Sequence, residues 1–121
     1  MTEAKRLFDE ALREWAAGEH YEAHELLEDV AECFEDDDPS FDIAIAFVHV
    51  AAAFHKIVND VGARAAPGKI ERALTVLETA PDVWLGIDVR AFVEALRGVL
   101  ATAASGAKPE VFPTPRAPGS S

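Results

Sequence analysis

The apolar positions of the chain recur with helical spacing over most of its length. In residues 2–17 they lie three and four positions apart. The same spacing returns in three later segments, 20–34, 69–79 and 89–104. This period is typical of amphipathic helices, and no segment shows the alternation of a strand. Thr2, Ser40 and Asp88 precede helical segments and are predicted to cap them, and Gly18 predicts a tight turn between the first two helices.

The segment from about 41 to 60 differs from the other helices. Every residue from Ile43 to Phe54 is apolar except His49. A helix that is apolar on all sides is typical of a buried central helix, and this apolar run is shorter than the roughly 20 residues of a membrane span. The sequence therefore predicts an all-α fold, a single-domain bundle of about five helices around the central helix 41–60.

The composition changes near the end of the helical pattern. Residues 1–104 are long enough for one helical domain. Residues 105–121 are rich in Pro, Gly and Ser, and they hold four of the seven prolines, which neither helices nor sheets accommodate well. We expect a tail over 105–121 that packs, if it packs at all, through Val111 and Phe112.

The charge of the chain is concentrated in its first third. The net charge is −11, and residues 1–42 hold 15 acidic against 3 basic side chains, whereas residues 43–121 hold 7 against 8. An acidic chain is poorly suited to coat nucleic-acid phosphates or anionic membranes, so neither partner is expected. The acidic first hairpin predicts a solvated face, with a docking surface for a protein partner as the alternative. The first residues lack a secretory pattern, and a cytoplasmic location is expected.

Candidate chemistry centres on the second predicted helix. His20, His24 and Glu28 lie four residues apart and so share one helix face, beside the apolar stripe. His49 is the only polar side chain in the central apolar run. A buried imidazole without a partner costs about 1–3 kcal/mol, so His49 predicts a polar partner across the core. We expect that partner on the His24/Glu28 side of the second helix, which also carries Tyr21.

Three interpretations of this polar stripe stay open. The first is a hydrogen-bonded His–Glu network that fixes helix packing. The second is a divalent-metal or small-ligand site with His24, Glu28 and His49 as candidate ligands. The third is general acid–base catalysis, with Glu25 or Tyr21 assisting. The zinc-protease pattern needs a second His where this chain has Glu28. Cys33 is expected to be a small core residue, because nothing basic lies beside it in the sequence.

Two segments resemble a known family. Residues 18–28, GEHYEAHELLE, and residues 48–63, with the alanine-rich run before Asn59 and Gly62, resemble the signatures of the "domain of unknown function 309" family. The resemblance covers residues 7–100 and implies a small all-α fold of about five helices without implying an activity. This chain has Ala31 where the family usually has Trp, and Ile45 and His49 where it usually has Gln. Asn59 and Gly62 also suit the left-handed backbone that ends a helix.

Two functional hypotheses follow from these patterns. The leading hypothesis is a non-catalytic binding or assembly module that forms a homodimer, since a helix apolar on every face needs covering and a second copy can supply the cover. The alternative is a metal or small-ligand site, possibly catalytic, between the second and third helices. In it Glu28 would act as base or ligand, and His24 and His49 as ligands or proton carriers. The geometry of the three side chains separates the two hypotheses.

Overall fold

The computed structural model describes residues 2–119, and these form the predicted helical bundle. Five α-helices make up most of the chain: α1 (Glu3–Ala16), α2 (His20–Glu32), α3 (Pro39–Asn59), α4 (Ala66–Leu77) and α5 (Val89–Ala104). A short 3₁₀ helix, η1 (Ala63–Ala65), precedes α4. The predicted all-α class and the central helix are confirmed.

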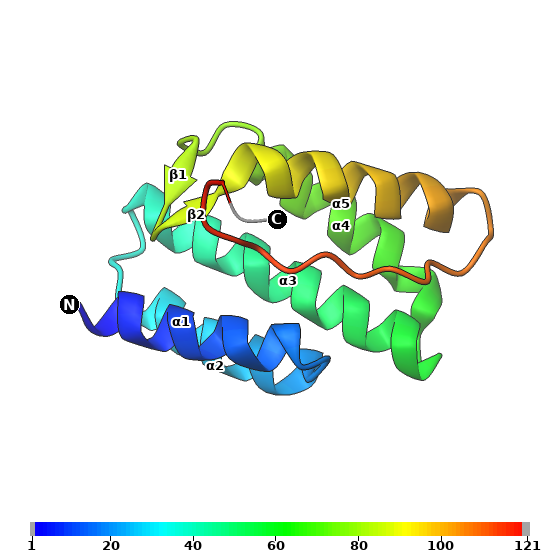
Figure 1. Ribbon diagram of the computed structural model, residues 1–121, viewed down its shortest axis with the longest axis horizontal. Coiled ribbons are helices and arrows are strands. Elements are labelled where there is room, and N and C mark those ends of the chain that lie inside the picture. Colours follow the sequence, from blue (N-terminus) through cyan, green and yellow to red (C-terminus); the bar gives the residue numbers. More distant parts are fainter. Residues whose placement is uncertain (1, 120–121) are drawn as a thin grey trace.

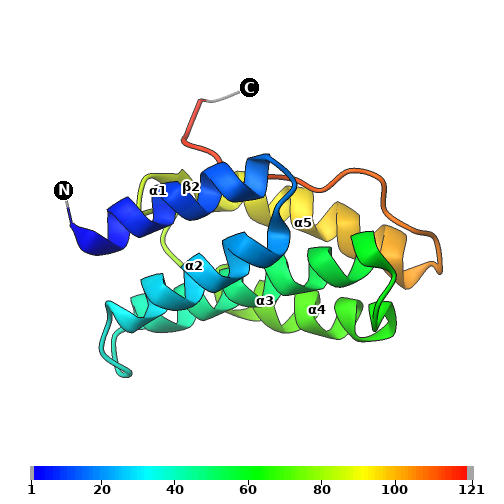
Figure 2. The same ribbon diagram turned by 90° about the horizontal axis from the view of Figure 1, so that it is seen from below.

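The helices form two layers. Helix α3 packs between α2 and α4, α1 packs on α2, and α5 packs on α4. Figures 1 and 2 show α2, α3 and α4 side by side in one layer, with α1 and α5 on the same side of it. Residues 107–119 run between α1 and α5, across α3. One side of the α2–α3–α4 layer is therefore covered by other parts of the chain.

Aromatic side chains fill the space between the layers. Phe8, Trp15, Phe47 and Phe54 are fully buried. Trp84 stacks on Phe47, with ring centroids 5.7 Å apart and planes 12° from parallel. Fully burying a side chain of this size contributes about 1.5–3 kcal/mol, so these aromatic contacts are a major part of what holds α1 and α5 on α3.

The predicted caps are confirmed at two helices and wrong at a third. The Thr2 hydroxyl accepts a hydrogen bond from the Lys5 amide at 3.1 Å, and the Asp88 carboxylate accepts one from the Ala91 amide at 3.0 Å. Helix α3 is capped by Asp38 instead of Ser40, because Pro39 occupies its first position, which suits a residue without an amide hydrogen. The Ser40 hydroxyl instead accepts a hydrogen bond from the Trp84 indole at 3.0 Å.

The central helix begins two residues before, and ends one residue before, the expected range 41–60. Helix α3 has 21 residues, so by length and composition it could cross a membrane, although the apolar run alone is too short. Of its most apolar window, 56% is buried inside the fold. Core helices of soluble proteins meet the same criterion, so the length of α3 is weak support for a membrane span.

Two short strands interrupt the helical pattern, which the sequence did not predict. Strands β1 (Val83–Trp84) and β2 (Ile87–Asp88) pair antiparallel around a two-residue turn. Both turn residues, Leu85 and Gly86, have positive φ, at 45° and 82°, as tight hairpin turns require. Strands of two residues are too short to show an alternating pattern, so no sequence signal marked them.

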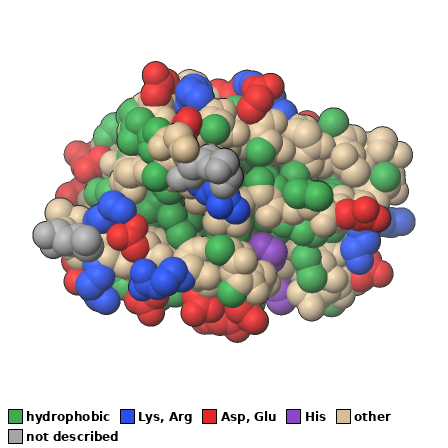
Figure 3. All heavy atoms as spheres, viewed as in Figure 1, with side chains coloured by type: hydrophobic (Ala, Val, Ile, Leu, Met, Phe, Trp, Pro, Cys, Tyr) green, Lys and Arg blue, Asp and Glu red, His purple; other side chains and the backbone are tan. Residues whose placement is uncertain are grey.

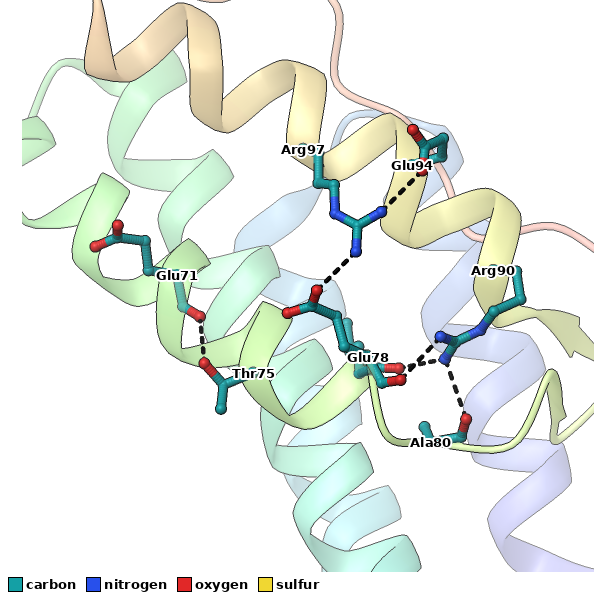
Figure 4. Close-up of polar contacts among 8 residues, drawn as sticks. Glu71, Thr75, Glu78, Ala80, Arg90, Glu94 and Arg97 are labelled. Carbon is teal, nitrogen blue, oxygen red and sulfur yellow. Dashed lines mark hydrogen bonds and ion pairs between the residues drawn. The ribbon is translucent and has the colours of Figure 1, made fainter.

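Arg90 joins the end of α4 to the start of α5. Its guanidinium donates to the carbonyl oxygens of Glu78 and Ala80 at 3.0 and 3.1 Å, and also to that of Leu77 (Figure 4). A cation in the first turn of α5 opposes that helix's own dipole. Here the Arg90 guanidinium donates to carbonyl groups at the end of α4 that have no donor within the helix. Its positive charge also lies at the negative end of the α4 dipole. Nearby, Arg97 pairs with Glu78 at 2.6 Å.

The tail crosses the front of the bundle as an extended strand-like segment without regular structure. The Pro113 carbonyl accepts a hydrogen bond from the Trp15 indole, and the Arg116 carbonyl accepts one from the Asp88 amide. Phe112 packs on Phe54, with ring centroids 5.1 Å apart. Val111 is 77% exposed. The packing predicted for the tail is therefore right for Phe112 and wrong for Val111, whose side chain stays mostly exposed.

Candidate functional site

His24 and Glu28 lie one turn apart on α2, as predicted. His24 Nε2 is 3.4 Å from Glu28 Oε1, and His24 Nδ1 is 3.3 Å from the Tyr21 carbonyl oxygen. With both ring nitrogens facing acceptors, the two contacts are complete only when the imidazole carries both protons. The Glu28 side chain is 54% exposed, so solvent screens this pair strongly and its contribution to stability is small.

His49 faces the open side of the α2–α3–α4 layer. Partial burial, followed by the positive charges of Lys69 and Arg72 and by His24, lowers the pKa of His49 below its ordinary value. His49 thus lies between α2 and the basic side chains of α4. Within residues 2–119 its ring makes no hydrogen bond to another residue, and the partner expected across the core is absent. Because the ring is only partly buried, water can satisfy it, so no internal partner is needed.

The metal site expected from His24, Glu28 and His49 is not formed. Within residues 2–119 no three His, Cys, Asp or Glu side chains lie close enough to share an ion. A transition-metal site in a protein needs at least three such ligands around one point. The donor set therefore does not fit a divalent metal in this arrangement.

His20 belongs to a different environment from His24. It is 6% exposed and lies at the front of the bundle, among the rings of Trp15, Phe54 and Phe112. Burial, and secondarily the nearby His55, lowers the pKa of His20. Helical spacing grouped His20 with His24, but His20 is the first residue of α2, where α1 and the tail cover it. Figure 3 shows histidine side chains close together on this side of the molecule.

A small pocket lies between α2 and α3. It has a volume of about 200 Å³ and is lined by Tyr21, His24, Ala52, His55 and Lys56. The Tyr21 ring contacts both imidazoles, with centroids 5.4 Å from those of His24 and of His55. His55 was not among the predicted site residues, because it follows the apolar run and reads as the end of it. Its spacing from Tyr21 and His24 depends on how α2 packs on α3, which the sequence does not show.

The other predicted residues, Glu25, Asn59 and Gly62, lie outside the pocket lining. Glu25 is exposed on α2, and no polar contact to it is present within residues 2–119. Asn59 is helical and donates to the His55 ring and carbonyl at 3.0 and 2.9 Å. The left-handed residue that ends α3 is Asp60, with φ 53°, and Gly62 follows with φ 66°. The expectation of a left-handed backbone is therefore right for Gly62 and wrong for Asn59.

Cys33 is exposed rather than in the core, which corrects its predicted position. It ends α2 and its thiol donates weakly to the Asp29 carbonyl at 3.5 Å. Partial desolvation together with Glu3, Asp29 and Glu32 raises the pKa of the thiol. A thiol held protonated in this way is a poor nucleophile.

The open side of the layer has a definite charge pattern, and we name it the α2–α4 face. It consists of His24 and Glu28 on α2, Ile45, His49 and Ala52 on α3, and Lys69 and Arg72 on α4. The three α3 residues are spaced for one helix face and are all partly exposed. The centre of the face therefore carries Ile45 and Ala52 with His49 between them, its carboxylate lies on the α2 side, and its two basic residues lie on the α4 side.

No family model matches the chain, and no curated protein matches it. The function is therefore inferred from the geometry of the α2–α4 face, the pocket and the tail.

Proposed function

We propose that the chain is a non-catalytic assembly module that pairs with a second copy of itself through the α2–α4 face. The observation that carries this proposal is the opposite charge of the two edges around His49. Glu28 lies on one side, and Lys69 and Arg72 lie on the other, close enough to His49 to influence its titration. Charges arranged this way complement a second copy of the same surface.

The symmetry of the face makes the pairing possible. A twofold axis running along α3 in the plane of the interface would place α2 of one copy over α4 of the other. Glu28 would then face the Lys69 and Arg72 side of its partner, twice in the same interface. The half-buried Ile45 and Ala52 of each copy would meet along the axis, where their apolar surface would leave water.

The same face explains what the acidic first hairpin contributes. Helix α2 carries five acidic residues, whereas Lys69 and Arg72 belong to the evenly charged remainder of the chain. Like-charged edges would repel a copy that docks with α2 over α2. Electrostatic complementarity of this kind fixes orientation and discriminates between partners more than it adds affinity. We therefore expect a dimer of modest affinity and defined orientation.

Charge reversal tests the pairing directly. In sedimentation velocity, Arg72→Glu and Glu28→Lys should each shift the chain toward monomer, since each creates a like-charge contact at both ends of the interface. The double variant E28K/R72E should recover part of the dimer, because the exchanged charges at positions 28 and 72 again attract each other, although Lys69 stays positive. Arg13→Glu makes the same charge change on α1, outside the face, and should leave the association unchanged. Equal association in all four proteins would contradict the proposal.

A second candidate function is the binding of a small anionic group in the α2–α3 pocket. The observation that favours it is the lining, in which Lys56 and the imidazoles of His24 and His55 surround the Tyr21 ring. A volume of about 200 Å³ suits a group no larger than one side chain. Titration with inorganic phosphate should shift the imidazole NMR signals of His24 and His55, and Lys56→Met should abolish the shift. Unshifted signals at millimolar phosphate would reject this function.

Other expectations from the sequence keep the status of proposals. Membership of the "domain of unknown function 309" family is supported by the two signature segments and is consistent with the five helices. A cytoplasmic location is supported by the charged first residues, which do not resemble a secretory signal, and partners that are neither nucleic acid nor membrane are supported by the acidic composition. None of these supplies a reaction.

A further inference from the structure

The tail lies on the bundle as a bound peptide would lie on a receptor. We name the surface beneath it the tail groove, formed by Trp15 of α1, His20 of α2, Phe54 of α3 and Ala91, Ala95 and Gly98 of α5. Figure 3 shows hydrophobic side chains across the band that the tail crosses. Pro109 and Pro115 are buried at two positions along this path.

The groove recognises the backbone of the tail as well as its side chains. The Trp15 indole donates to the Pro113 carbonyl at 3.0 Å, and the Asp88 amide donates to the Arg116 carbonyl at 2.9 Å. Phe112 occupies an aromatic site, with ring centroids 5.1 Å from Phe54 and 5.9 Å from His20. An indole donor beside an aromatic site is also how proline-rich ligands are held in aromatic-lined grooves.

The composition of the tail suits an extended ligand. Each of its four prolines has a fixed φ, and the residue before each proline is pushed toward extended backbone. Little conformational entropy is lost when such a segment docks, because few conformations are open to it beforehand. The segment Phe112–Pro115, Phe-Pro-Thr-Pro, therefore combines one aromatic anchor with a preorganised backbone.

The chain's own tail leaves the groove incompletely filled. A cavity of about 420 Å³ lies between the tail and α5, lined by Ala95, Gly98, Val99, Thr102 and Pro109 among others. A second cavity of about 350 Å³ follows along the same side, beside Ala91 and Phe92. Val111 of the tail borders both cavities and is still 77% exposed, so it does not fill them. A ligand with larger side chains facing α5 would bury more surface here than the tail does.

We propose that the tail groove is a binding site for extended segments of partner proteins with an aromatic-Pro-x-Pro core, and that the chain's own tail occupies it until such a segment displaces it. The site lies on α1, α5, the front of α3 and the first residue of α2, His20. The α2–α4 face proposed for dimer formation is on the other side of the layer. A result that contradicts the proposal for one surface therefore does not contradict the proposal for the other.

The first test uses a fluorescent peptide with the sequence of residues 107–118 and the full-length protein. A tethered tail competes at an effective concentration of about millimolar, so wild type should bind the peptide weakly. The full chain with Phe112→Ala has a weakened competitor and should bind the peptide at least about tenfold more tightly. A peptide carrying the same Phe→Ala change should bind that protein about tenfold more weakly than the unchanged peptide. Circular dichroism confirms that F112A keeps its helices.

A second measurement covers the case in which F112A unfolds. A protease site inserted in the exposed turn 105–108 allows the tail to be cut while it remains seated in the groove. The labelled peptide should then exchange with the cut tail, and Trp15→Phe in the same protein should speed the release of the tail. If neither F112A nor the cut protein binds the peptide, the groove serves only to hold the chain's own tail, and the proposed binding of partner segments is wrong. If wild type dimerises and F112A dissolves the dimer, the occupant is the tail of a second copy and the partner assignment fails.

Discussion

The indole nitrogen of Trp15 donates a hydrogen bond to the carbonyl oxygen of Pro113 over 3.0 Å, although 98 positions separate the two residues in the chain. Trp15 is 1% exposed, at the centre of an aromatic cluster with His20, Phe54 and Phe92. The bond therefore joins the tail to the core itself rather than to the surface. It makes Trp15 the residue on which the position of the tail depends most.

Trp15→Phe should loosen the tail and lower the stability of the protein. The smaller ring stays in the aromatic cluster, but the Pro113 carbonyl loses its donor. We expect a loss of about 1–3 kcal/mol in the free energy of unfolding, measured by urea denaturation. Cleavage by trypsin after Arg116 should also become faster. Val111→Ala, at an exposed tail position, is the matched control and should change stability by less than about 0.5 kcal/mol.

Arg90→Ala should destabilise the junction between α4 and α5. Removing the guanidinium leaves the carbonyl groups of Leu77, Glu78 and Ala80 without their donor. We expect a loss of about 1.5–3 kcal/mol, typical of hydrogen bonds to a charged group. Arg97→Ala removes an arginine from the same helix whose pairs with Glu78 and Glu94 are exposed, so its effect should be clearly smaller. Equal losses in the two variants would show that Arg90 acts only as a surface charge.

The stability of the protein should fall as the pH drops below the ordinary pKa of histidine. Burial lowers the pKa of His20 in the folded protein, so the unfolded chain binds this proton at a higher pH than the folded one. The contribution is fully present above about pH 7 and is lost as the pH falls through 6.5 toward the folded pKa. His49 shifts in the same direction and adds to the effect.

His20→Phe isolates the part of this pH dependence that belongs to His20. Phenylalanine keeps an aromatic ring against Trp15 and Phe54 but cannot take up a proton. The variant should therefore lose less stability than wild type between pH 7.5 and 5.5, in chemical denaturation at each pH. Identical losses in both proteins would show that His20 titrates in the folded state as it does in the unfolded chain.

Replacing each of two glycines by alanine should change the stability of the protein in opposite directions. Gly98 lies inside α5, and a methyl group there meets nothing within 4 Å, so Gly98→Ala should stabilise the protein by about 0.5–1 kcal/mol. Gly62 has φ +66°, where a side chain is strained, and Gly62→Ala should cost about 1–2 kcal/mol. Thermal unfolding of the two variants measures both changes. A gain at Gly62 would mean that the turn after α3 has a different backbone from the one described here.

The helices could be predicted from the sequence because each one buries a regular stripe of side chains. The spacing of Phe8, Ala11 and Trp15, for example, needs no knowledge of what covers them. The sequence predicts Ser40 as the cap of α3, since serine suits that role, but Pro39 at the first helical position makes Asp38 the cap, two residues earlier. The β1–β2 hairpin was missed because its strands have two residues each, below the length at which a pattern exists.

The candidate site could be predicted only where it lies on one helix. The His24–Glu28 contact follows from spacing within α2 alone. The position of His49 depends on which side of α3 the other helices leave open, and the environment of His20 depends on a tail from the far end of the chain. Such contacts arise from tertiary packing. The spacing of residues within one helix does not show which other segments pack against it.

Sedimentation equilibrium of the wild-type protein tests the proposed assembly most directly. Across about 1–100 μM at low salt, we predict a reversible monomer–dimer equilibrium with a dissociation constant in this range, as modest interfaces show. Raising the ionic strength to about 1 M, where the Debye length falls to about 3 Å, should weaken the dimer, because Glu28, Lys69 and Arg72 are solvent-accessible charges. A chain that stays monomeric at every concentration and salt would contradict the account.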